Sequence, residues 1–119
     1  ELFLEIEDVI DPIEIGGDTN YRVRIVNQGT KAATNIRLQI DFPVGLAPTS
    51  VNGSLRHAIR GQQIIFEPIN SMNPNDELSF MINGRGQSVG DHRVVVSMQT
   101  DGRTSPVSKQ ESTRVYSDQ

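Results

Sequence analysis

Apolar and polar residues alternate along much of this chain, most clearly between residues 21 and 42. In the first run, Tyr21, Val23 and Ile25 are separated by arginines. After the polar segment Asn27–Lys31, the alternation returns with four apolar residues: Ile36, Leu38, Ile40 and Phe42. A period of two is typical of a β-strand with one face on a core and the other in water. The pattern therefore predicts two half-buried strands separated by a polar turn.

The same alternation recurs in shorter segments on both sides. It predicts strands around five further rows: Leu2, Leu4 and Ile6; Ile64, Ile65 and Phe66; Leu78, Phe80 and Ile82; Val94, Val96 and Met98; and Thr113 and Val115. Pro12 interrupts the first row, because proline cannot donate to a ladder, and the strand can switch sheets before Ile13 and Ile15 resume it. No window has a capped helical period. About seven to nine short strands predict one antiparallel sandwich or barrel domain over residues 1–119.

Turn residues separate these strands. Gly29 is expected to supply a positive φ, while the Asn27 side chain bonds to its own backbone. Asn52–Gly53 predicts a tight turn, because both residue types tolerate positive φ. Residues 70–76 are expected to form a loop in which Met72, the only apolar side chain, fills a gap in the core.

Charge and cysteine content exclude several kinds of chemistry. Fifteen acidic and eleven basic residues give a formal net charge of -4, and the arginines are scattered among acids, so no nucleic-acid partner is expected. The absence of cysteine removes disulfides, thiolate metal sites and cysteine nucleophiles. Apolar runs of only a few residues predict no direct membrane insertion. The chain opens on Glu1 without a signal peptide, and we interpret it as a piece of a longer precursor.

One motif is reminiscent of a hydrolase. Gly86–Gly90 spells G-x-S-x-G around Ser88, with His92 close by in sequence. A nucleophile elbow needs a strand before it and a helix after it, whereas another strand follows here. Ser88 is therefore expected in a glycine-rich hairpin. The Gly84-x-Gly86 pair has no following helix that could make it a phosphate cradle.

Metal and glycan chemistry have weak support. His57 and His92 lack zinc-ligand spacing, and His92 is in phase with the Val94 row, which favours a structural role at the end of the core. Four acidic residues near one end could hold calcium, but without a calcium-loop motif a solvated rim is favoured: Asp8, Asp11, Glu14 and Asp18. The sequon Asn52–Ser54 coincides with the predicted turn. No Trp is present to stack on sugars, which disfavours a lectin.

Several segments together resemble a known bacterial family. They are Gly17–Val23, Val26–Ile36, Asp41–Leu46, Ile65–Ile69 and Met72–Asp76. Their order is similar to the bacterial conserved repeat domain, also called domain of unknown function eleven. The resemblance covers roughly residues 10–100, with Met72 and Asn75 where the family often has leucine and glycine. The closing segment Glu111–Tyr116 is similar to the tails of such modules in large planctomycete surface proteins.

This resemblance implies an immunoglobulin-like antiparallel β-sandwich without catalytic residues to transfer. We therefore expect a non-catalytic structural or adhesive module of a bacterial cell-surface or exported protein, with neighbouring domains of the same polypeptide as partners. The alternative is an accessory module that binds other cell-surface proteins or a cell-wall glycan through an exposed edge strand or its turn loops. No catalytic, metal or cofactor-binding residue is assigned, and no cofactor is expected.

Overall fold

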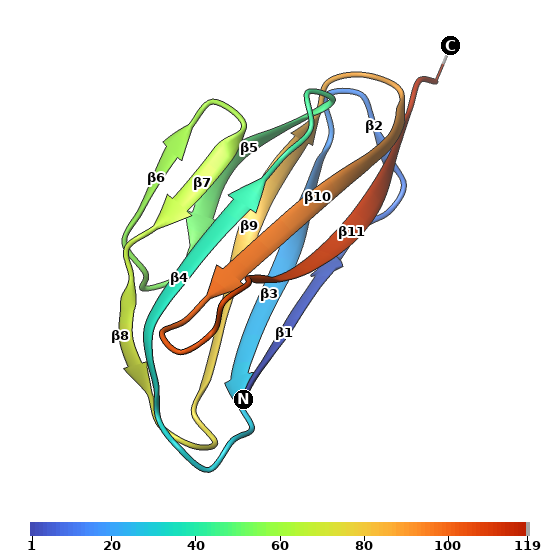
Figure 1. Ribbon diagram of the computed structural model, residues 1–119. Helices are drawn as coiled ribbons and strands as arrows, with labels where there is room; N and C mark the ends of the chain where they lie inside the picture. Colours follow the sequence, from blue (N-terminus) through green and yellow to red (C-terminus); the bar gives the residue numbers. More distant parts are fainter. Residues whose placement is uncertain (119) are drawn as a thin grey trace.

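The computed structural model describes residues 1–118 as strands and connecting loops (Figure 1). The strands are β1 (Leu2–Asp8), β2 (Ile13–Glu14), β3 (Asp18–Asn27), β4 (Ala33–Asp41), β5 (Leu46–Asn52), β6 (His57–Arg60), β7 (Gln63–Phe66), β8 (Ile69–Met72), β9 (Glu77–Gly86), β10 (Gly90–Gln99) and β11 (Val107–Tyr116). Within residues 1–118 there is no helix with the length and apolar character needed to span a membrane.

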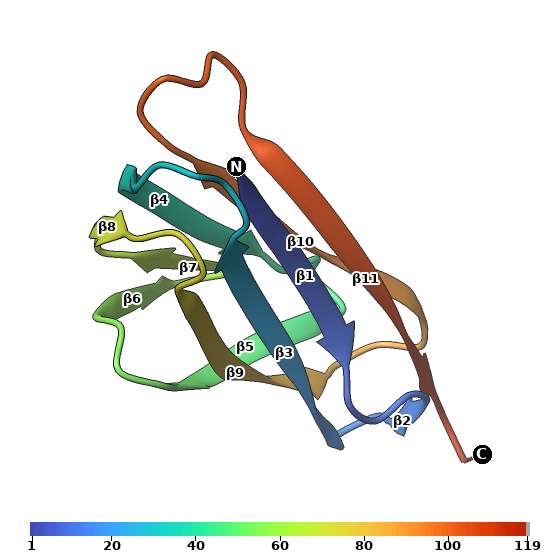
Figure 2. The same cartoon turned by 90° about the horizontal axis from the view of Figure 1, so that it is seen from below.

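The strands form two packed sheets (Figures 1 and 2). The first sheet has the order β1-β3-β9-β5, and the second has the order β2-β11-β10-β4-β7-β6. β7 and β8 pair with different halves of the same edge of β4. The pairing of β2 with β11 is parallel, and the other pairings are antiparallel. This arrangement matches the sandwich that the alternation predicts.

The core lies between the apolar row of β3 and the apolar row of β4. The row on β3 and the row on β4 are each at most 3% exposed: Tyr21, Val23, Ile25, Ile36, Leu38 and Ile40. The two rows face each other from opposite sheets, because the connection after Asn27 crosses between sheets instead of closing a hairpin. The two predicted half-buried strands are confirmed, and they cover the core from its two sides.

Pro12 marks a second crossing, as predicted. β1 pairs with β3 in the first sheet, whereas β2 pairs with β11 in the second. The Asp11–Pro12 peptide bond between them is cis. Ile13 is buried at 5% exposure, but Ile15 is 43% exposed, so only Ile13 rejoins the core.

Two segments expected to be loops are strands. Ile69–Met72 forms β8, because its backbone completes the ladder beside Ala33 and Ile36 of β4. Met72 is 4% exposed and fills the core as predicted. β9 continues through Gly84 to Gly86, where the absent side chains leave room for neighbouring aromatic and aliphatic groups.

Gly29 and Gly53 are needed for close packing, and the predicted positive φ is wrong for both. A Cβ on Gly29 would collide with the Glu1 nitrogen, and one on Gly53 would lie 2.8 Å from Phe80 Cβ. Asn52 is the last residue of β5, and the chain after it crosses to the other sheet. The predicted tight turn is therefore wrong, whereas the Asn27 turn is confirmed by its Oδ1, which accepts from the Gly29 N–H at 3.0 Å.

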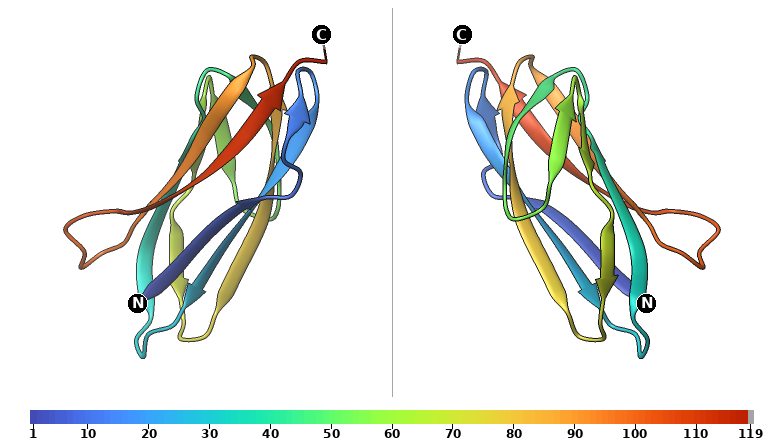
Figure 3. Two further views of the ribbon diagram at one scale, coloured as in Figure 1. Left: turned by 90° about the vertical axis from the view of Figure 1, so that its right-hand side faces the viewer. Right: turned by 90° about the vertical axis from the view of Figure 1, so that its left-hand side faces the viewer.

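The molecule is elongated, with extents of 53 × 25 × 23 Å. Glu1 and the end of β11 lie toward opposite ends of the long axis (Figure 3). β1 and β11 contact each other where the two sheets meet. The chain therefore enters the domain through β1 at one end of the long axis and leaves it through β11 at the other. We call the end at Glu1 the N-terminal pole.

Candidate functional site

The G-x-S-x-G motif lies in the connection between β9 and β10. These strands belong to different sheets, so the predicted hairpin is wrong and the connection is a crossing. His92 Nε2 donates to the Ser88 carbonyl oxygen at 2.7 Å, and its ring covers Gly45. The imidazole is half-buried at the end of the core row, where the sequence placed it. It holds the loop backbone through this bond, and no hydrogen bond joins it to the Ser88 hydroxyl.

The two histidines are not brought together. His57 lies on the edge strand β6 against Phe66, with ring centroids 6.1 Å apart, whereas His92 lies on β10, and both β4 and β7 separate the two strands. Within residues 1–118, no three acidic or histidine side chains are grouped so that they could hold a metal ion.

The acidic residues near the Pro12 crossing lie in different environments. Asp18 forms an ion pair with Arg85 at 3.1 Å, and Glu14 extends from β2. Asp8 and Asp11 instead lie beside β11, where the fold adds Glu111, 103 residues from Asp8. The sequence gives no indication of this third carboxylate, because only the packing of β1 against β11 brings it there.

Hydrogen bonds order this group. The Tyr21 hydroxyl donates to Thr113 Oγ1 at 2.6 Å, and Thr113 Oγ1 donates to Asp8 Oδ2 at 2.9 Å. Glu111 Oε2 accepts from the Asp8 N–H at 3.0 Å. Asp11 Oδ1 accepts from the Arg114 N–H, also at 3.0 Å. The group therefore fastens the crossing between β1 and β2 to β11.

The same group changes the ionisation of two members. Burial raises the pKa of Asp8 from 3.8 to about 6; the Thr113 hydrogen bond opposes this rise, and Asp11 and Glu111 add to it. Burial also raises the pKa of Tyr21 to about 12. Tyr21 stays protonated at neutral pH and can keep donating to Thr113.

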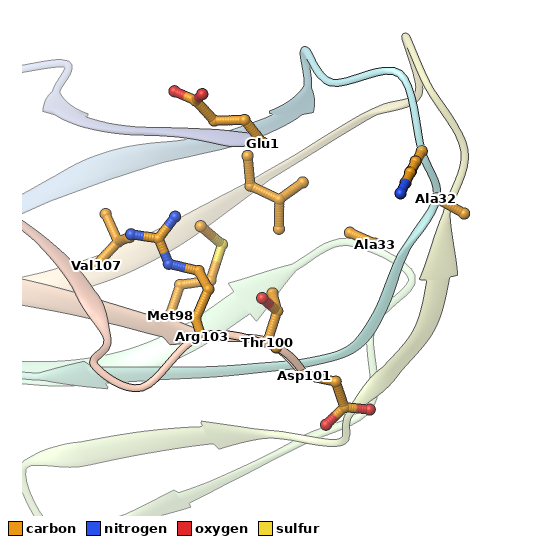
Figure 4. A pocket seen from close by; sticks show the side chains of 11 residues that line it. Glu1, Ala32, Ala33, Met98, Thr100, Asp101, Arg103 and Val107 are labelled. Carbon is orange, nitrogen blue, oxygen red and sulfur yellow. The ribbon is translucent and has the colours of Figure 1, made fainter.

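A pocket of about 240 Å³ opens near the N-terminal pole, between the start of β1, the start of β4 and the connection from β10 to β11 (Figure 4). Its apolar lining comes from four strands: Leu2, Ala33, Met98 and Val107. The charged groups are two cations, Lys31 and Arg103, and two carboxylates, Glu1 and Asp101. Thr100 adds a hydroxyl from a residue that is 7% exposed. Sequence reasoning missed this pocket, since Lys31 and Arg103 come from connections 72 residues apart.

Backbone and side-chain hydrogen bonds position the pocket walls. Asn27, fully buried, donates from Nδ2 to the carbonyl oxygens of Lys31 and Met72 at 3.0 and 2.9 Å. The Glu1 carbonyl oxygen accepts from the Gln28 N–H at 2.8 Å. Across the pocket, the Asp101 N–H donates to the Thr34 carbonyl oxygen at 3.3 Å. These contacts hold the β3–β4 and β10–β11 connections in a defined arrangement.

No family model matches the chain. Among solved structures, it is similar to a non-cellulosomal cohesin from Archaeoglobus fulgidus, with 18% identity, a TM-score of 0.59 and coverage of 98% of this chain and 93% of that chain. It is also similar to a CARDB domain from Pyrococcus furiosus solved in complex with di-metal ions, with 14% identity, a TM-score of 0.62 and coverage of 98% and 88%.

A third similar structure is a family 123 glycoside hydrolase from Clostridium perfringens, with 13% identity and a TM-score of 0.61. The match covers 90% of this chain but only 22% of the hydrolase, so the chain corresponds to about a fifth of that protein. At these identities, the likeness concerns the fold alone. The chain has an all-β, immunoglobulin-like sandwich fold, as the sequence analysis predicts.

Proposed function

We propose that this domain is a non-catalytic structural module of a longer bacterial cell-surface or exported protein, where it spaces the domains on either side of it. The observation that carries the proposal is the placement of Glu1 and the end of β11 toward opposite ends of a 53 Å long molecule. The fold shared with cohesin and CARDB domains supports it. The resemblance to the bacterial conserved repeat domain belongs to the same proposal, with neighbouring domains as the partners.

The end of the molecule where β11 finishes exposes apolar side chains on its loops. We call this surface the C-terminal pole, defined by Ile15, Val44, Val89 and Tyr116, which are 43, 83, 57 and 40% exposed. Three connecting loops and the end of the chain gather there in Figure 1. Exposed apolar groups at one place are typical of a contact surface. A domain that follows residue 118 would emerge beside them.

The loops of the C-terminal pole are tied to one another. The Gly16 N–H donates to the Gly86 carbonyl oxygen at 2.9 Å, and the Gly86 N–H donates to the Gly17 carbonyl oxygen at 3.0 Å. The Gln87 N–H donates to the Gly45 carbonyl oxygen at 2.8 Å. These bonds join the β2–β3, β4–β5 and β9–β10 connections. The pole therefore offers a preorganised surface on which a neighbouring domain can pack without ordering the loops first.

The test is a protein with two copies of the chain in tandem, studied by small-angle X-ray scattering. We expect a maximum dimension near twice 53 Å and a narrow distribution of shapes. Replacing Val44 and Val89 with serine should broaden that distribution, because the packing surface is lost. Ile59→Ser with Ile65→Ser is the matched control, since these side chains are also exposed but lie on β6 and β7.

Two results would contradict the proposal. One is a compact tandem protein in which the two copies fold back on each other. The other is turnover of activated esters that disappears in Ser88→Ala, because this would make the domain a hydrolase and restore the role that its loop position argues against.

A second candidate function, binding of a ligand or partner, is favoured by the pocket near the N-terminal pole. Its lining combines an apolar floor with charged side chains on connections whose backbone is held by hydrogen bonds. The edge strand β6 is a weaker candidate, because arginine at its end and histidine at its start are the charged and polar groups that discourage strand addition.

A further inference from the structure

We propose that the pocket near the N-terminal pole binds a small aliphatic carboxylate, either a free acid or the C-terminal residue of a peptide. The inference does not depend on the structural role proposed above. It rests on the chemistry of the pocket lining, which offers an apolar floor and two cationic side chains within one cavity of about 240 Å³.

The floor suits an aliphatic chain. Met98 is 2% exposed, and Leu2, Ala33 and Val107 are partly buried where they pack on the core. Each belongs to a different strand, so the surface is held by both sheets. An aliphatic group of the ligand would cover apolar surface that now faces solvent, and removing that surface from water favours binding.

The rim suits a carboxylate. Among residues 1–118, neither Lys31 nor Arg103 has an acidic partner within 4.0 Å, whereas seven other ion pairs are formed. Asp101 is engaged by Arg37 and Asn35, and Figure 4 shows its side chain turned away from Arg103. A guanidinium can bind a carboxylate with two parallel hydrogen bonds.

The size of the pocket limits the ligand. Sites for drug-sized molecules usually measure about 300–1,000 Å³. At about 240 Å³, this pocket has room for one short side chain and its carboxylate. The Thr100 hydroxyl, from a residue that is 7% exposed, can add one hydrogen bond to a ligand oxygen.

The test uses the 119-residue protein and titrations followed by amide NMR spectra. Isocaproate should cause saturable shifts at residues 31–33 and 100–103, and isocaproamide should bind at least about tenfold more weakly, because it lacks the charge. A short peptide ending in leucine is compared with its amidated form in the same way. Binding of the peptide without binding of isocaproate identifies a C-terminal residue as the ligand, and binding of both identifies the carboxylate itself.

Variants distinguish a specific binding site from a general attraction of anions to the cations of the protein surface. Arg103→Gln should weaken isocaproate binding about tenfold, and Lys31→Gln should act in the same direction. Arg56→Gln, at an exposed cation that does not line this pocket, is the control and should change nothing. The dispersion of the spectra verifies that each variant is folded. The proposal is overturned if neither ligand gives saturable shifts, if acid and amide bind equally, or if both pocket variants bind like the parent protein.

Discussion

Asp8 is the residue whose ionisation depends most visibly on the fold. Its pKa rises to about 6 because its carboxyl is partly buried beside Glu111 and Asp11, although Thr113 donates to it. Between pH 4 and 6, the folded protein therefore holds a proton that the unfolded chain has released. Stability from this group is complete below about pH 4 and is lost as the pH rises through 6.

Asp8→Asn removes this titration. We expect the variant to lack the decline in stability between pH 4 and 7 that Asp8 causes, and to be more stable than the parent protein at pH 7. The free energy of unfolding in urea, measured at intervals over this range, checks the expectation. Asp118→Asn, at an exposed side chain, is the control. Equal pH dependence in the Asp8 variant and the parent would contradict the assignment.

Single residues also show where sequence reasoning succeeds and where it stops. The Asn27 turn was predictable, because an asparagine side chain bonds to backbone two residues ahead wherever the chain permits. The positive φ predicted at Gly29 and Gly53 is wrong. Glycine is found both where φ is positive and where the backbone packs closely against other atoms, and the sequence does not distinguish these two uses. Here close packing is the reason, because Gly29 lies against Glu1 and Gly53 lies against Phe80, and both contacts depend on the tertiary fold.

At the scale of elements, Asn27 joins three parts of the chain. It ends β3, and its side chain bonds to the Gly29 N–H and to the carbonyl oxygens of Lys31 and Met72. Asn27→Ala should lower the free energy of unfolding by about 2–4 kcal/mol, because buried backbone groups lose their partners. Urea unfolding measures the loss. Asn70→Ala on β8, at an exposed side chain, should change stability by less than about 0.5 kcal/mol, and equal losses would contradict this role.

The sequence predicted those strands in which buried and exposed residues alternate over many positions. Strands with one buried face, such as β3 and β10, were predicted because every second residue is apolar. β8 was missed because Asn70 and Ser71 are exposed and its only buried anchors are at its ends, so its alternation is too short to recognise. β9 was cut short at Asn83 because Gly84 and Gly86, which indicate a turn by residue type, here make room for packed side chains.

At the scale of the whole molecule, the sequence predicted the class of fold but not which strands are neighbours. Successive strands β3 and β4 lie in opposite sheets, and so do β5 and β6, and β9 and β10. Strand pairing depends on contacts far apart in sequence, and no local pattern reports them. For the same reason, the placement of Glu111 beside Asp8, and of Lys31 and Arg103 around one pocket, was not predictable from spacing.

The placement of the first and last strands has a consequence for how the domain responds to force. When the two ends are pulled apart, β1 is drawn along β3 and β11 along β10. Their hydrogen bonds run across the strands, so the seven paired positions of β1 and the nine of β11 are loaded together in shear. Attachment at Glu1 and Lys31, near one pole, would instead peel β1 from β3 one pair at a time. Single-molecule unfolding should therefore need a clearly higher force when the domain is pulled through the start of β1 and the end of β11, and equal forces would contradict this shear geometry.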